Sequence, residues 1–267
     1  MPASARPFSD CPTVALAAVT GVLTDIDDTL THEGAVEPEA LAALGALRSA
    51  DIPVIAITGR PMGWSAPFAR AWPIDAIVAE NGAVALFMHA GDLRIEYAQD
   101  DATRTHNCKR LAEVAQRVLR EVPGATLARD SAGRVTDIAV DHSEFAHLDD
   151  AAIARVVALM HSEGMNATVS SIHVNGWFGD HDKLSGARWI VRRLLGRDVE
   201  AERGRWLYVG DSTNDQLMFE HFPVSVGVAN LMRFAAQLHT WPAWITEAER
   251  GRGFAQVAQR LLGARGA

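Results

Sequence analysis

Cysteine, long apolar runs and net positive charge are all scarce in this chain of 267 residues, and each shortage excludes a class of protein. The only two cysteines, Cys11 and Cys108, lie far apart, so the chain has neither a disulfide framework nor a cysteine-based metal site. No apolar run approaches the roughly 20 residues that a membrane-spanning helix needs. The net charge of −8 argues against nucleic acid or an anionic membrane as the main partner.

The N-terminal region gives an expectation about location. Two distant cysteines favour free thiols, which are typical of a reducing compartment. The apolar stretch 13–23 resembles the core of a signal peptide, but Asp10 precedes it, Arg6 is the only basic residue before it, and it runs into an acidic cluster. We therefore interpret residues 1–12 as a loose tail and expect a cytoplasmic protein.

The first third of the chain alternates between strand and helix patterns. Apolar runs predict strands over residues 20–25, 52–58 and 76–84, and helices are predicted over 38–50 and after Pro61. Strands separated by helices form parallel sheets with right-handed crossovers. We expect an α/β fold with a Rossmann-like, doubly wound parallel sheet.

The rhythm changes near residue 86 and returns near residue 175. In between, helices alternate with pairs of short strands, the first pair surrounding the turn residues Ala90-Gly91-Asp92. This pattern predicts an antiparallel sheet with helices on one face. We therefore expect a core made of residues 1–85 and 175–267, interrupted by an α+β domain at 86–174.

Polar residues gather at the carboxyl ends of the predicted parallel strands, where ligands bind in open α/β sheets. Asp25 and Asp27 follow the first strand, and Thr58 follows the second. Asp211 follows the strand RWLYVG, and Lys183 begins the helix that leads into that strand. These acids, one hydroxyl and one ammonium can converge on one edge of the sheet.

Carboxylates that converge need a counter-charge, and Mg²⁺ is the natural partner because it prefers oxygen ligands. We expect Asp25 and Asp211 to supply carboxylate oxygens and a backbone carbonyl near Asp27 to add another. Asp215 is either a further ligand through water or a residue that only orients Lys183. The residues around the predicted metal are Asp25, Asp27, Asp211 and Asp215.

The same residues suit phosphoryl transfer. Asp25 is placed to attack phosphorus and form an aspartyl phosphate, while the metal and Lys183 neutralise the phosphoryl oxygens. Thr58 adds a neutral hydrogen bond. Asp27 would protonate the leaving alkoxide and then activate water. Asp28 has no assigned role.

These motifs resemble the haloacid dehalogenase superfamily of phosphatases. DIDDTL at 25–30 is similar to the first motif of that family, Thr58 to the second, Lys183 to the third and GDSTND at 210–215 to the fourth. An insertion between the second and third motifs resembles the large C2-type cap of the Cof-like subgroup IIB, with its sucrose-phosphate, trehalose-phosphate and mannosyl-phosphoglycerate phosphatases. The resemblance covers about residues 20 to 262 and implies a phosphatase.

Substrate contacts are harder to place, because a cap of this kind would read the leaving group and the cap sequence is the least informative. The candidates are Thr58, Gly59, Arg60, Asn81, His173, Asn175, Lys183 and Asn214. Alternatives stay open: Asn214 could cap a helix, Asn81 could belong to a turn, and His173 and Asn175 could pack between the domains.

We therefore predict a Mg²⁺-dependent phosphatase acting on a sugar phosphate or a similar small metabolite. A sugar phosphomutase with the same phosphoenzyme is the nearest alternative. A phospho-receiver domain would share the acids, the threonine and the lysine, but it has no inserted domain. A carbon–halogen dehalogenase would not need Asp27, and an inactive binding protein would have no need to keep the acids and Lys183 together.

Overall fold

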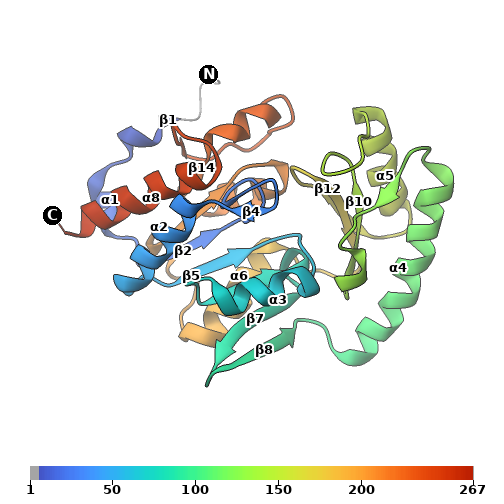
Figure 1. Cartoon of the computed structure of the whole chain (residues 1–267), viewed down its shortest axis with the longest axis horizontal. Helices are drawn as coiled ribbons and strands as arrows, with labels where there is room; N and C mark the ends of the chain where they lie inside the picture. The colour runs from blue at the N-terminus through green and yellow to red at the C-terminus, as the bar shows by residue number, and fades with distance from the viewer. Residues whose placement is uncertain (1–5, 267) are drawn as a thin grey trace.

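The computed structural model describes residues 6–266, which form a core built on one large sheet and a smaller domain beside it (Figure 1). The core sheet has nine strands in the order β1-β15-β14-β13-β2-β5-β6-β7-β8. In that order they are Arg6–Pro7, Trp244–Ile245, Val224–Gly227, Trp206–Gly210, Gly21–Thr24, Val54–Ile57, Ala76–Ala79, Val84–His89 and Asp92–Tyr97. Along this sheet, every neighbouring pair from β1 through β15, β14, β13, β2 and β5 to β6 is parallel. The last two pairs, β6–β7 and β7–β8, are antiparallel.

Helices cover both faces of this sheet, which explains why its central strands are continuous apolar runs. One face packs against α1 (Thr13–Ala17), α2 (Pro38–Ser49), α3 (Met62–Ala71) and α8 (Arg250–Arg265). The other face packs against α6 (Lys183–Leu195) and α7 (Gln216–His221). The predicted doubly wound α/β fold is confirmed.

The smaller domain, which we call the cap, is a four-stranded antiparallel sheet with two helices on one face. Its strands follow the order β11 (Asn166–Val169), β12 (His173–Trp177), β10 (Asp137–Asp141) and β9 (Thr126–Leu127). Asp100 and Asp149 cap the N-termini of α4 (Asp101–Glu121) and α5 (Asp150–Ser162) by accepting backbone hydrogen bonds. Each helix buries one apolar stripe against the sheet, and the predicted α+β arrangement is confirmed.

Short elements complete the described chain. A two-stranded hairpin, β3 (Thr31–His32) and β4 (Ala35–Val36), follows the acidic loop after β2. The 3₁₀ helices are η1 (Phe8–Asp10), η2 (Glu80–Gly82), η3 (Ser131–Gly133), η4 (Arg203–Arg205), η5 (Thr213–Asp215) and η6 (Ala229–Phe234). Among the described residues, no helix is long and apolar enough to cross a membrane.

The expected domain boundaries need two corrections. The hairpin β7–β8 pairs with β6 in the core sheet, and the first four residues of β7 are buried there, so it is not part of the inserted domain. Strand β12 crosses the expected boundary at residue 174 and pairs along its whole length within the cap sheet. Judged by sheet membership, the cap lies between Tyr97 and Phe178.

The interpretation of residues 1–12 as a loose tail is wrong for the part that the structure describes; residues 1–5 lie outside it. Strand β1 pairs with β15, and Phe8 and Cys11 are buried in the core. The Arg260 guanidinium on α8 donates hydrogen bonds to the carbonyl oxygens of Phe8 and Cys11. Burial of the Phe8 ring holds this segment to the core. Cys11 and Cys108 are both free thiols.

Candidate active site

Parallel pairing of three central strands brings the predicted residues to one edge of the sheet. Strand β2 lies between β13 and β5, with Thr24 aligned to both Val209 and Ala56. The three strands therefore end at the same level of the sheet, which places Asp25 beside the segments that begin with Asp211 and Thr58. The convergence predicted from the sequence is present.

Lys183 lies at the centre of this edge and is almost fully buried. Its Nζ donates to Asp25 Oδ1 and to Asp215 Oδ1, both at 2.6 Å, and to Asn214 Oδ1 at 3.4 Å. The first turn of α6 sets the position of Lys183, because Asp182 caps the helix through the backbone N–H of Ser185.

The loop at η2 packs closely against the start of α6. Gly82 has φ of +113°, and a Cβ there would lie 2.1 Å from the carbonyl oxygen of Asp182. Only glycine allows both this backbone conformation and this close approach. The packing therefore helps to fix where Lys183 enters the site.

Asp215 has no carboxylate oxygen left for a metal. Its Oδ1 accepts from Lys183 and from the Tyr208 hydroxyl, and its Oδ2 accepts from the backbone N–H groups of Asp211 and Ser212, at 2.9 and 3.1 Å. Of the two roles left open by the sequence, these contacts favour orientation of Lys183. Tyr208 was not predicted to be at the site; its only signal was a hydroxyl-bearing residue within an otherwise apolar strand.

Asp211 differs from Asp215 because, among the described residues, only one of its two carboxylate oxygens accepts a hydrogen bond. Its Oδ2 accepts from Asn230 Nδ2 at 3.1 Å, but its buried Oδ1 has no hydrogen-bond partner within the described chain. Carboxylate oxygens of Asp25, Asp211 and Asp215 lie within 4.8 Å of one another. An orphaned buried oxygen beside a second carboxylate fits a hard divalent cation, so the residues present suit Mg²⁺.

The electrostatics of the three carboxylates suit a cation site. Burial raises the pKa of Asp211 well above its ordinary value, and the neighbouring Asp25 and Asp215 raise it further. Burial also raises the pKa of Asp25 to about 7, although Lys183 opposes the shift. The two buried carboxyl groups resist being ionised at the same time, and a bound cation would stabilise the ionised form of both.

Asp27 points away from this cluster, as the sequence suggested. Its Oδ1 accepts from Arg60 Nε at 2.9 Å, and the Thr58 hydroxyl donates to its Oδ2 at 3.4 Å. The carboxylate is not among the three that lie together, so a contribution of Asp27 to a metal site would have to come from its backbone carbonyl.

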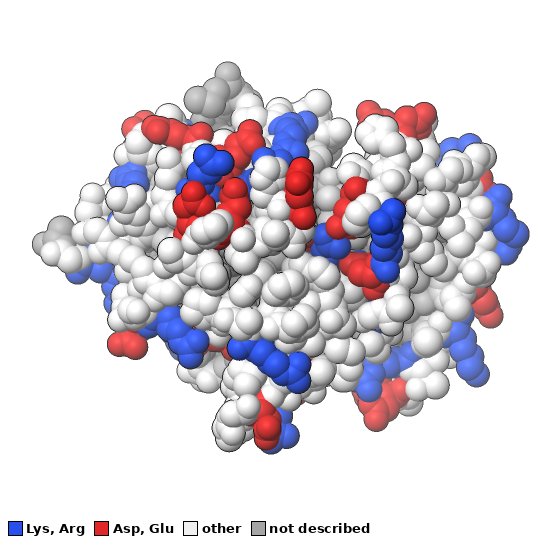
Figure 2. Space-filling view, in the orientation of Figure 1, with Lys and Arg blue, Asp and Glu red and all other residues white. Residues whose placement is uncertain are grey.

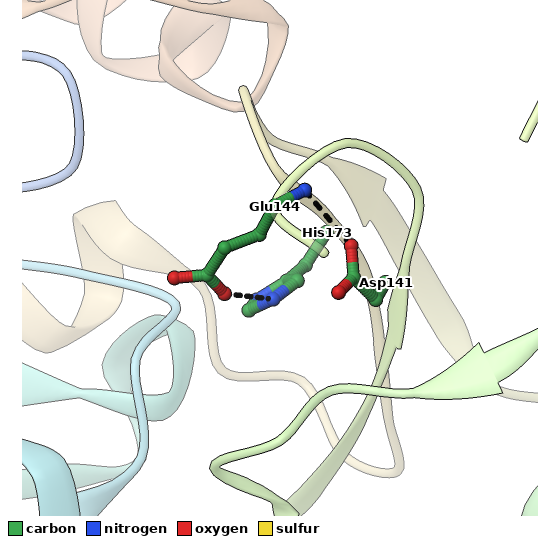
Figure 3. A group of neighbouring side chains, drawn as sticks. All are labelled: Asp141, Glu144 and His173. Atoms are coloured by element: carbon green, nitrogen blue, oxygen red, sulfur yellow. Dashed lines mark hydrogen bonds and ion pairs between the residues drawn. The ribbon is translucent and has the colours of Figure 1, made fainter. Parts of the chain in front are cut away.

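Arg60 joins the core to the cap. Its Nη2 donates to Glu144 Oε1 at 2.7 Å, and its Nη1 donates to Asp130 Oδ2 at 3.2 Å. The other oxygen of Glu144 contacts His173 Nε2 at 3.0 Å (Figure 3). Burial alone would raise the pKa of Glu144, but hydrogen bonds from His173 and Arg60 outweigh it and lower that pKa to about 2.

A cavity of about 430 Å³ lies between the core and the cap beside Asp27. It is lined by Asp27, Asp28, Thr31, His32, Glu33, Gly34, Arg60, Ser143, Glu144, Phe145, Ile172 and Arg250. Asp28, which had no predicted role, accepts from Arg250 Nε at 2.9 Å and has φ of 54°. His32, Glu144 and Arg250 were missed because nothing in their local sequence marks them.

Of the predicted substrate contacts, only Arg60 lines this cavity. Asn175 Nδ2 donates to the carbonyl oxygen of Gly59 at 3.0 Å and to Asp137 Oδ2 at 3.2 Å, so it packs between the domains. Asn81 is buried behind Thr58, to whose carbonyl oxygen its N–H donates. The alternatives for Asn81 and Asn175 are therefore favoured over substrate contact.

The chain is similar to known proteins in part of its sequence and in its fold. Residues 22–116 match the model of a family described as haloacid dehalogenase-like hydrolase. A search of curated proteins gave no match. This match covers about a third of the chain, and the solved structures described next share its fold.

Several solved structures share the fold over most of both chains. A protein of Thermoplasma acidophilum has a TM-score of 0.70 at 14% identity, covering 91% of this chain and 98% of its own. The C-terminal domain of trehalose-6-phosphate phosphatase from C. albicans has a TM-score of 0.65 at 14% identity, covering 98% of each chain. The sucrose-phosphatase of Synechocystis, in complex with sucrose and phosphate, has a TM-score of 0.63 at 14% identity, covering 90% of this chain and 97% of its own.

Proposed function

We propose that this chain, a haloacid dehalogenase-like hydrolase by its family match over residues 22–116 and by its fold, is a Mg²⁺-dependent phosphatase of a sugar phosphate or a similar small metabolite. One observation carries the proposal. The Lys183 ammonium lies between Asp25 and Asp215, whose carboxylates lie within 4.8 Å of that of Asp211, and Oδ1 of Asp211 has no hydrogen-bond partner within the described chain. A buried carboxylate nucleophile, an ammonium held beside it and a carboxylate oxygen available to a metal together suit attack on phosphorus.

Asp25 is the nucleophile in this proposal. Lys183 holds its Oδ1, so the other carboxylate oxygen is left to attack phosphorus, forming an aspartyl phosphate as the bond to the leaving oxygen breaks. Burial lowers the pKa of Lys183, but Asp215 and Asp25 raise it above its ordinary value, so the ammonium stays charged. Mg²⁺ held by Asp25 and Asp211 would neutralise charge on the phosphoryl oxygens.

Asp27 is the general acid and then the general base in this proposal. It gives a proton to the leaving alkoxide in the first step. In the second step it takes a proton from water, whose oxygen attacks phosphorus while the bond to Asp25 breaks and phosphate is released. Thr58 and Arg60 hold the Asp27 carboxylate toward the cavity, where the leaving group would lie.

The cap supplies the other wall of that cavity. Residues from the 141–145 turn face residues from the loop after β2, so the leaving group would be enclosed between the domains. Enclosure excludes bulk water from the first step and gives the protein a surface that reads the alcohol. The sucrose-phosphatase and trehalose-6-phosphate phosphatase that share this fold are the reason for proposing a sugar phosphate.

The test is a phosphate-release screen over sugar phosphates, with and without Mg²⁺. We expect Mg²⁺-dependent release by the wild type, none by Asp25→Asn, and wild-type release by the control Asp92→Asn in the exposed β7–β8 hairpin. Near-normal turnover by Asp25→Asn would refute the nucleophile. An isomerised sugar phosphate without free phosphate would show a mutase instead.

A further inference from the structure

Carboxylates outnumber basic groups on the lining of the cavity between core and cap. Besides Asp27, which carries a proton in the first step proposed above, the charged lining residues are Asp28, Glu33, Glu144, Arg60 and Arg250, a formal excess of one negative charge. Figure 2 shows acidic side chains on both sides of the junction between the domains, with isolated basic side chains among them. Arg129 is not one of the lining residues; its guanidinium lies 3.8 Å from the ring centroid of Phe145, which is one of them.

Both cavity arginines are already neutralised by carboxylates. Arg60 is only 5% exposed and donates hydrogen bonds to Asp27, Asp130 and Glu144. Arg250 donates to Asp28 and Glu249. All three nitrogens of Arg60 donate to carboxylates, so an anionic group that approaches Arg60 would have to displace one of them.

Glu144 is held in place as a charged group on the cap side. Its two oxygens contact Arg60 and His173, and its backbone N–H donates to Asp141 Oδ1 (Figure 3). Asp141, Glu144 and His173 lie close enough to suggest a metal site, but their contacts argue against one. Asp141 accepts three backbone hydrogen bonds from the turn, and the Arg60 guanidinium fills the place beside Glu144.

Resting on the phosphatase function proposed above, we propose that this cavity selects phosphate monoesters with an uncharged, hydroxyl-rich leaving group, and that Glu144 is the residue that determines this selectivity. Sugar hydroxyls can donate hydrogen bonds to the lining carboxylates, and an uncharged leaving group is not repelled by them. A carboxylate or second phosphate on the leaving group would face net negative charge in a partly enclosed site. One unit charge at about 7 Å, with an effective dielectric constant of roughly 20–40, corresponds to a discrimination of about tenfold or more.

The experiment uses two pairs of substrates that differ chiefly in one charged group. Glycerol 3-phosphate is compared with 3-phosphoglycerate, and glucitol 6-phosphate with 6-phosphogluconate, by kcat/KM of phosphate release with Mg²⁺. The variants are Glu144→Gln, which removes the charge, and Glu144→Asp, which keeps it. Glu163→Gln is the matched control, a glutamate of the cap that pairs with Arg117 and does not line the cavity.

We expect the wild type to prefer the uncharged member of each pair by about tenfold or more. Glu144→Gln should reduce that preference by about tenfold, while Glu144→Asp and Glu163→Gln keep it. Equal or better hydrolysis of the charged members by the wild type would overturn the selectivity and leave the phosphatase function standing. An unchanged preference in Glu144→Gln, with an unchanged unfolding temperature, would overturn the role of Glu144. Absence of hydrolysis of every ester, including p-nitrophenyl phosphate, would overturn the phosphatase function and this selectivity with it.

Discussion

Replacing Asp211 with asparagine should abolish the effect of Mg²⁺ on stability without destabilising the metal-free protein. Among the residues that the structure describes, the buried Oδ1 of Asp211 has no hydrogen-bond partner, and carboxylate oxygens of Asp25, Asp211 and Asp215 lie within 4.8 Å of one another. The asparagine oxygen can keep the hydrogen bond from Asn230, and its amide group would face the two carboxylates. Relief of like-charge repulsion, partly offset already by Lys183, is worth about 0–2 kcal/mol in favour of the variant.

The wild type should behave differently when the metal is added. A ligand that binds only the folded state at 100 times its Kd stabilises that state by about 2.7 kcal/mol. For a chain of this size, that corresponds to a rise in unfolding temperature of about 5 °C or more. The assay is thermal unfolding of wild type, Asp211→Asn and the hairpin control Asp92→Asn, each with EDTA and with a series of Mg²⁺ concentrations.

Two results would contradict this reasoning. A full Mg²⁺-dependent rise in the Asp211→Asn variant would show that Asp211 is not a ligand. A metal-free variant less stable than the wild type by more than about 1 kcal/mol would show that Oδ1 has a favourable partner that the described contacts do not contain.

Three further predictions test other parts of the site. Asp27→Asn should lower kcat by about 10²–10⁴ by removing the proton donor, and unchanged turnover in a phosphate-release assay would refute that role. Glu80→Gln should lower the free energy of unfolding in urea by about 1–3 kcal/mol, because the Glu80 carboxylate accepts hydrogen bonds from the cap at Val135 and Thr136; an unchanged midpoint would contradict this. The folded-state pKa of Glu144 is lowered to about 2 from an ordinary 4.5, so its contribution to stability should be present above pH 4.5 and be lost as the pH falls toward 2. Carboxyl chemical shifts against pH check this value, and a Glu144 midpoint near 4.5 would show that its pairing with Arg60 is absent.

Features set by short stretches of chain were predicted well. Helix α2 begins at Pro38, as its sequence indicated, and strands β2 and β5 fall within the predicted apolar runs. The acids, Thr58 and Lys183 converge as expected, because the ends of parallel strands share an edge whatever the details of packing. These predictions needed only local patterns and the rule that parallel strands require crossovers.

Errors arose where the outcome depended on which segment pairs with which. The β7–β8 hairpin was correctly predicted as a hairpin but was placed in the wrong sheet, because its turn residues say nothing about the strand beside it. Phe8 and Cys11 looked like part of a loose tail, since the groove that buries them is built by α8 at the other end of the chain. Neither partner is visible in the local sequence.

The sequence by itself determined which groups meet at the edge of the sheet, since they are a few residue types at strand ends and their order along the chain reveals them. Only the tertiary structure decided how those groups are used. It showed Asp215 committed to Lys183 and Tyr208, Asp211 left with an orphaned oxygen, and Arg60 paired with Glu144 across the domain junction. Such roles depend on distances of a few ångströms between residues far apart in sequence, and only the packing of core against cap sets those distances.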